Sequence, residues 1–260
     1  MTPSALDRGL EAALRHDRRL AIASLSAVVV LAWVYLWRSA AGMDHASMAM
    51  ATMPRAADAG ALALTVLMWA VMMAGMMLPS AAPMILLYGA LVRKSGASGT
   101  VLPRVWSFAG AYLLVWAGFS MAAAMLQTLL ERAALLTPAM AAASAGISAL
   151  ALIAAGAYQL TPLKQVCLNR CRSPLEFLVT RWRAGAGGAF RMGLEHGAFC
   201  VGCCWALMLL LFVAGVMNLL WVALIAAFVF VEKLLPAASV TSRVAAAALI
   251  LSGLFLLTGI

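Results

Sequence analysis

The sequence predicts an all-α protein, a polytopic transmembrane helical bundle of about seven helices. Apolar residues make up 65% of the 260 residues and charged residues only 10%, whereas about a quarter of a soluble protein is charged. The apolar residues also fall in long runs separated by short basic segments, as membrane proteins require. Despite a net charge of +9, this pattern excludes a nucleic-acid-binding domain, a disordered chain and an ordinary soluble globule.

Each candidate membrane helix is a run of apolar residues, and about 20 of them are needed to cross a bilayer. We expect the second run to tilt or break at Pro79 and Pro83, because it is longer than one crossing needs. A tight turn near Met217 and Asn218 should join the fifth and sixth runs as an antiparallel hairpin. The seven runs are Leu20–Trp37, Leu62–Leu91, Val105–Leu130, Ala139–Leu160, Gly193–Gly215, Leu219–Leu235 and Val244–Gly259.

The first run has a second interpretation. Arg18 and Arg19 before it and Ser39-Ala40-Ala41 after it resemble a secretory signal with its cleavage site. Its apolar part is long for a signal, so we expect a retained anchor over residues 20–38.

Basic residues predict the orientation. All lysines and arginines except Arg38, Arg55 and Arg132 fall on the segments that share a side with the N-terminus. The positive-inside rule therefore predicts N-in and C-out. The expected organisation is a cytoplasmic tail (1–19), the anchor (20–38), a Met/His-rich periplasmic loop (39–61) and a six-helix metal-binding membrane domain (62–260). The domain would contain a cytoplasmic loop at 161–192, with Gly185–Gly188 as a flexible patch.

A cysteine-histidine cluster opens the fifth run. His196, Cys200, Cys203 and Cys204 fall on one side of a helix that turns about 100° per residue. An imidazole and three thiols can therefore meet at one point, as a soft or borderline metal requires. Simple packing and thiol redox chemistry are the alternatives. Packing explains one cysteine in a membrane helix well, but explains three with a histidine poorly.

A second pair of thiols lies just after the fourth run. Cys167 and Cys171 share a face if their segment is helical, and the topology places them on the same side of the membrane as the cluster. They are candidates for completing its ligand set. Glu232 is a weaker candidate, because an ion pair with Lys233 or a nearby arginine is the simpler expectation.

Methionines recur at helical spacing in the second run and gather again in the preceding segment. Thioethers are soft ligands that select Cu(I), although a helical row of methionines is more often core packing. We expect a possible metal relay from the outer segment toward the cysteines. Its members are His45, Met48, Met50 and Met53, followed by Met68, Met72, Met73, Met76 and Met77.

Several ordered motifs resemble the bacterial family of predicted metal-binding integral membrane proteins known as domain of unknown function 2182. The resemblance covers about Leu62 to Pro236. It implies a multi-pass protein of the bacterial inner membrane and a metal role for Cys167, Cys171, His196, Cys200, Cys203 and Cys204, without an established activity. The motifs are Met68–Met73, Met77–Met84, Tyr158–Lys164, Cys171–Leu175, Gly193–Gly197, Cys200–Trp205 and Glu232-Lys233.

These observations predict a Cu(I)-handling membrane protein that transports copper or delivers it to a membrane enzyme. Zinc and haem are the other possible cofactors. A structural or assembly subunit of a larger membrane complex is the main alternative, and a transmembrane thiol redox carrier is a further one. The expected partners are the lipid bilayer and a membrane enzyme or complex subunit, but no nucleic acid. We expect no enzyme, because neither a catalytic triad nor a nucleotide-binding glycine loop is recognisable.

Overall fold

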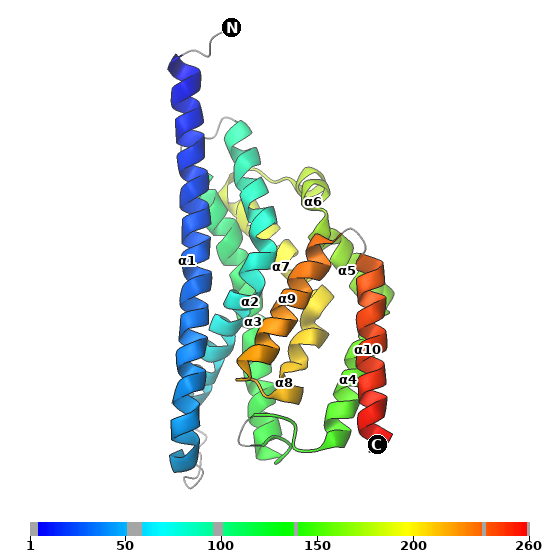
Figure 1. The fold of residues 1–260 in the computed structure, drawn as a ribbon. Coiled ribbons are helices and arrows are strands. Elements are labelled where there is room, and N and C mark those ends of the chain that lie inside the picture. Colours follow the sequence, from blue (N-terminus) through cyan, green and yellow to red (C-terminus); the bar gives the residue numbers. More distant parts are fainter. Residues whose placement is uncertain (1–4, 51–58, 96–100, 138–139, 236–237, 259–260) are drawn as a thin grey trace.

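The computed structural model describes residues 5–50, 59–95, 101–137, 140–235 and 238–258. Within these ranges the regular structure is helical, apart from one isolated bridge between Leu136 and Ala142. The predicted all-α class is confirmed. The long helices run alternately up and down, and the turns between them bring distant segments side by side (Figure 1).

The helices divide into three groups along the chain. The first comprises α1 (Ala5–Met50), α2 (Ala59–Lys94) and α3 (Val101–Arg132). The second comprises α4 (Ala145–Gln159), α5 (Pro162–Arg172) and α6 (Pro174–Arg181). The third comprises α7 (Gly185–Leu209), α8 (Leu211–Ala214), α9 (Leu219–Leu234) and α10 (Ala238–Thr258).

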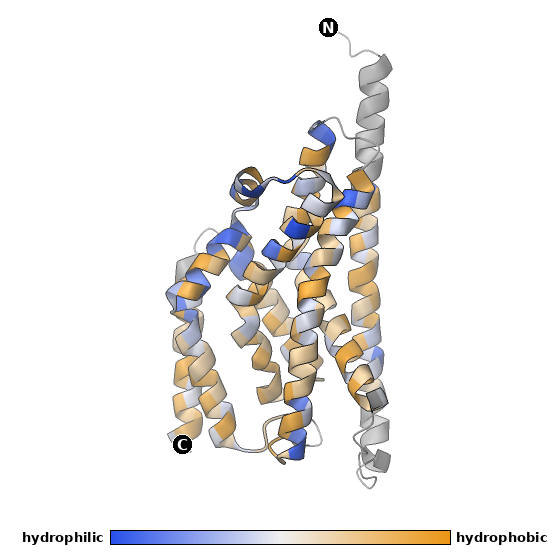
Figure 2. Cartoon of the chain, turned by 180° about the vertical axis from the view of Figure 1, so that it is seen from behind, coloured by the Kyte–Doolittle hydropathy of each residue, from blue (hydrophilic) through white to orange (hydrophobic). Residues whose placement is uncertain are grey.

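In the described part of the chain, five helical segments are long and apolar enough to cross a membrane: Arg19–Ala41, Gly60–Lys94, Val101–Arg132, Gly185–Ala214 and Val240–Thr258. The helices α4 and α5 meet at a bend of 64° and add a sixth if they count as one span. The described residues thus contain fewer candidate spans than the seven predicted runs. The reason is that α4, which begins only at Ala145, and α9, which has 16 residues, are each too short to count alone. Apolar residues cover these helices, whereas hydrophilic ones gather mainly at the end that carries α6 (Figure 2).

Two segments differ from the expected local structure. The helix α2 continues without interruption through Pro79 and Pro83. Proline leaves a backbone carbonyl one turn earlier without its donor, and neighbouring side chains and helices tolerate such a defect in membrane proteins. The segment 161–192, expected as a loop, folds into α5, α6 and the first turns of α7, and Gly185–Gly188 belongs to α7.

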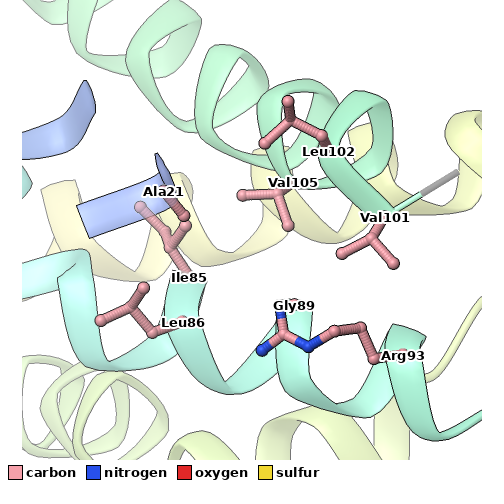
Figure 3. Close-up of a pocket in the computed structure, with 8 residues that line it drawn as sticks. All are labelled: Ala21, Ile85, Leu86, Gly89, Arg93, Val101, Leu102 and Val105. Atoms are coloured by element: carbon pink, nitrogen blue, oxygen red, sulfur yellow. The ribbon is translucent and has the colours of Figure 1, made fainter. Parts of the chain in front are cut away.

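The core of the bundle lies where α2, α3 and α7 meet, and α1 packs on its outside. A narrow pocket opens between α1, α2 and α3, and among its described lining residues only Arg93 is charged (Figure 3). Gly89 is part of its wall, and a Cβ atom there would lie 3.0 Å from the Val105 side chain of α3, a tight contact. Its described lining residues include no set of metal ligands, whereas the thiols lie in the interior of the bundle.

Candidate metal centre

The cysteine-histidine cluster lies on the buried face of α7, as its spacing predicts. His196, Cys200, Cys203 and Cys204 are all buried. Because α7 begins at Gly185 rather than near Gly193, the cluster occupies the middle of the helix and not its first turn.

Close packing of α7 against α3 places this face in the core. A Cβ atom at Gly193 would lie 2.2 Å from the backbone oxygen of Phe108, so only glycine fits there. Gly197 packs in the same way against Val115 and the backbone of Tyr112. Small residues allow helix backbones in membranes to approach one another in this manner.

Cys200 is the centre of the cluster. Its sulfur lies 3.1 Å from the Tyr112 hydroxyl and accepts a hydrogen bond of 2.9 Å from the Lys233 ammonium. The thiols of Cys203 and Cys204 donate to the backbone oxygen of Cys200, at 3.1 and 2.9 Å. Groups from α3 and α9 therefore hold the Cys200 sulfur, while two further thiols of α7 bind its carbonyl.

Other sulfur atoms surround Cys200. The Cys204 sulfur lies 4.0 Å from the Met77 sulfur of α2. Cys171 lies beside Cys200 and Cys203. The Cys167 sulfur packs on Gly202, where a Cβ atom would come within 2.7 Å of it. The five cysteines are free thiols, so α2, α5 and α7 together supply a sulfur-rich centre.

The His196 imidazole lies in an aromatic box one turn before Cys200. The ring centroids of Phe108, Tyr112 and Phe177 are 6.0, 5.6 and 5.7 Å from that of the imidazole. Its Nδ1 atom is buried and has no hydrogen-bond partner among the described residues. Such an orphaned nitrogen is costly, and it is also a free donor for a ligand.

The predicted ligands do not form a finished cage. Within the described residues, no group of three or more His, Cys, Asp or Glu side chains is placed to hold a metal ion. The Cys203 and Cys204 thiols donate to the Cys200 carbonyl, so their sulfur atoms do not converge with the Cys200 sulfur on one position. The donor types nevertheless fit a soft ion, because thiols and a thioether lie side by side.

A second polar cluster is built on Glu232, the residue that precedes Lys233 on α9. The Lys164 ammonium forms a 2.6 Å ion pair with Glu232 and also donates to Gln159. Ser242 of α10 donates to the same Glu232 oxygen at 2.6 Å. Glu232 therefore pairs with Lys164 rather than with the expected Lys233 or an arginine.

Sequence analysis missed three residues of the centre: Lys233, Tyr112 and Ser80, whose hydroxyl accepts a 2.9 Å hydrogen bond from Lys233. A lysine inside an apolar run is a signal for function in a membrane protein, and it would have identified Lys233. No comparable signal marks the tyrosine or the serine.

The methionines of the expected relay are only partly described. Met72, Met73, Met76 and Met77 are buried in α2, and Met68 is half-buried. Burial agrees with core packing as well as with a relay, so the relay stays a prediction. His45, Met48 and Met50 lie on the last turns of α1, where side chains are outside the described part, and Met53 lies outside the described residues.

The fold and the site together define a class: an all-α polytopic bundle with a buried, sulfur-rich centre suited to a soft metal. The chain matches the family model of PpoB2, described as a copper chaperone, over residues 66–256, and it belongs to that family. The expected resemblance is thereby confirmed as far as a copper-related family. Searches of the curated proteins and of the solved structures give no match.

Proposed function

We propose that this protein is an inner-membrane copper chaperone that holds Cu(I) at the sulfur-rich centre and delivers it to a copper-requiring membrane enzyme. The observation that carries the proposal is the meeting of thiols and a thioether from three helices around Cys200. Sulfur ligands of both kinds favour Cu(I) over harder ions, and the family match supports copper as the cargo.

The surroundings of Cys200 suit a site that is loaded and emptied. The Lys233 ammonium offsets the charge that a thiolate brings into a buried place, where an unpaired charge is expensive. Arriving Cu(I) takes over this role, and rotation of the Cys203 and Cys204 side chains brings further thiols to the ion. Each thiol gives up its hydrogen bond to the Cys200 carbonyl when it rotates, and such a bond contributes only modestly to stability.

The proposed location in the inner membrane rests on the apolar composition of the chain and on the positions of its basic residues. Several described basic residues lie at the end of the bundle where α2 ends and α7 begins, including Lys94, Arg104 and Arg191. The positive-inside rule then orients that end toward the cytoplasm. Membership of the bacterial metal-binding family suggested by the motifs is part of this proposal.

Metal analysis tests the proposal. The detergent-purified protein is compared with the triple variant Cys200→Ser, Cys203→Ser, Cys204→Ser and with Ala198→Ser, a control on the exposed face of the same helix. We expect near-stoichiometric copper by mass spectrometry in the parent and the control, and almost none in the triple variant. Copper retained by the triple variant would overturn the site. Zinc in place of copper would overturn the proposal that copper is the cargo. No metal in any sample would favour a structural subunit of a larger complex.

A further inference from the structure

A strained methionine lies at the opposite end of the bundle from α6, in the loop between α3 and α4. Met140 has a φ of 57°, a left-handed conformation that is uncommon for any residue other than glycine. The loop enforces it: Met140 N donates to Thr137 O at 2.9 Å, and Thr137 N donates to Ala141 O at 2.7 Å. Strain of this kind persists where the surrounding structure imposes it, and it concentrates at functional sites.

A polar network holds the Met140 thioether in place. The sulfur accepts a 3.4 Å hydrogen bond from the Gln127 amide of α3. The same amide group donates to Glu131 at 2.9 Å, and its oxygen accepts a 2.7 Å hydrogen bond from the Trp69 indole of α2. Met140 is only 8% exposed, and Gln127 and Trp69 are buried. A methionine that merely fills space needs no such partners.

The same place favours a positive charge. The Glu131 carboxylate is only half-buried, and in the described part of the chain no lysine or arginine forms an ion pair with it. The Gln127 Nε2 group donates to both the Met140 sulfur and the Glu131 carboxylate. A thioether and a carboxylate therefore face one donor group, whose place between them a cation can take.

Gln127 connects the site to Trp69 of α2, just before the buried methionines of that helix. Trp69 is followed on the same helix by Met72, Met73, Met76 and Met77, and all are buried. Successive turns of a helix are about 5.4 Å apart. The last of these thioethers lies 4.0 Å from Cys204, so soft sulfur atoms extend from the Met140 end of α2 to the thiols.

We propose that Met140, with Glu131 beside it, forms a second metal site at which Cu(I) enters the protein. This inference rests on the proposed function, because it assumes Cu(I) as cargo. Transfer onward is a ligand exchange between thioethers. Copper keeps its oxidation state, one sulfur–copper bond forms as another breaks, and no proton moves because a thioether carries none.

The binding test removes the thiols first. In a variant with all five cysteines changed to serine, the remaining weak sites are titrated with Ag(I), a soft monovalent ion that is not reduced or oxidised under these conditions. Met140→Leu is compared in this background with Met125→Leu, a 48% exposed methionine of α3. We expect Met140→Leu to remove about one equivalent of Ag(I), and Met125→Leu none. Equal binding by the two variants would overturn the entry site.

A second measurement guards against misfolding of the cysteine-free protein. The parent, Glu131→Gln and Met140→Leu are each loaded with copper at their thiols and then titrated with Ag(I). Glu131→Gln removes the negative charge of the side chain and keeps its shape. We expect binding of the additional equivalent to weaken about tenfold in Glu131→Gln and to disappear in Met140→Leu, while the copper already bound stays. Unchanged Ag(I) affinity in both variants would overturn the inference. Loss of the thiol-bound copper in the triple cysteine variant is a separate result that concerns only the proposed function.

Discussion

Two buried lysines, Lys164 of α5 and Lys233 of α9, lie in neighbouring polar clusters and have different partners. Lys164 pairs with the carboxylate of Glu232 at 2.6 Å. Lys233, the next residue after Glu232, instead donates to the Cys200 sulfur and the Ser80 hydroxyl, each at 2.9 Å. Adjacent positions on one helix therefore serve two separate clusters.

The partners of each lysine indicate a structural role for the Lys164 cluster and a functional role for the Lys233 cluster. The Lys164 cluster is a complete ion pair with an additional hydroxyl donor, and it connects α5, α9 and α10. The Lys233 cluster ends on a sulfur, which can exchange an ammonium for a soft metal ion. Buried charges in membrane proteins generally mark functional sites, but here only the lysine beside sulfur belongs to the proposed copper centre.

Breaking the Lys164 pair should have the largest effect on stability. Lys164→Met leaves the Glu232 carboxylate buried without a counter-charge, which typically costs about 3–5 kcal/mol. We expect a large fall in the midpoint of thermal unfolding in detergent, with copper content unchanged in the molecules that remain folded.

The double variant Lys164→Met, Glu232→Leu is the matched control. Replacing both charges by apolar groups is often close to neutral, so stability should largely return. If the double variant were as unstable as the single one, the ion pair would not be the cause. If either variant lost copper while folded, the separation of the two clusters would fail.

Removing the charge of Lys233 should change metal selectivity more than stability. A positive charge near the centre repels a divalent ion twice as strongly as a monovalent one. At about 4 Å and an effective dielectric constant near 20, each unit of charge contributes about 4 kcal/mol. We expect Lys233→Met to shift the affinity ratio of Zn²⁺ to Cu(I) toward zinc by at least about tenfold.

Competition with chelators of known affinity measures this ratio for each ion. Lys233→Arg keeps the charge and is the matched control, for which we expect a ratio close to that of the parent. An unchanged ratio in Lys233→Met would show that the ammonium does not act on the bound ion.

The sequence allowed the fold class and the buried face of α7 to be predicted, because both depend on local patterns of apolar residues and on helical spacing. The residues at which the helices begin and end were less predictable. Gly185–Gly188 suggests a flexible segment, yet it begins α7. Packing of α7 on α3 at Gly193 compensates for the low helix propensity of glycine.

The partners of the site depend on contacts between distant segments and are therefore absent from local patterns. Tyr112 reaches Cys200 across 88 residues of sequence. Lys164 reaches Glu232 across 68. An ion pair between the neighbours Glu232 and Lys233 was the simpler expectation, but adjacent residues on a helix do not face each other.

The contact between α5 and α7 tests how closely the two clusters are connected. A Cβ atom at Gly202 would lie 2.7 Å from the Cys167 sulfur, and such overpacking typically costs about 1–3 kcal/mol. We expect Gly202→Ala to lower the thermal midpoint and to weaken copper binding, because α5 also carries Cys171.

Gly118→Ala is the control, since nothing lies within 4 Å of a Cβ atom at that position of α3. Alanine is the better helix former by about 1 kcal/mol, so this variant should be as stable as the parent or slightly more so. A similar loss of stability in both variants would contradict a specific contact between Gly202 and Cys167.

The smallest effect is expected from a single hydroxyl. Tyr112→Phe removes the contact with the Cys200 sulfur at 3.1 Å and the hydrogen bond to the Met77 oxygen at 3.2 Å. A typical hydrogen bond contributes about 1 kcal/mol. We expect a small fall in thermal midpoint and a Cu(I) affinity that changes only several-fold, measured by competition with a chelator.

Tyr158→Phe separates these two consequences. The Tyr158 hydroxyl donates to the backbone oxygen of Gly202 on α7 and touches no ligand sulfur in the described structure. Its loss should lower stability by no more than Tyr112→Phe does, because a single, partly buried hydrogen bond disappears. Cu(I) affinity should fall only in Tyr112→Phe, since only this hydroxyl fixes the position of the Cys200 sulfur. An equal change of affinity in both variants would mean that the tyrosines act through packing of α7 alone.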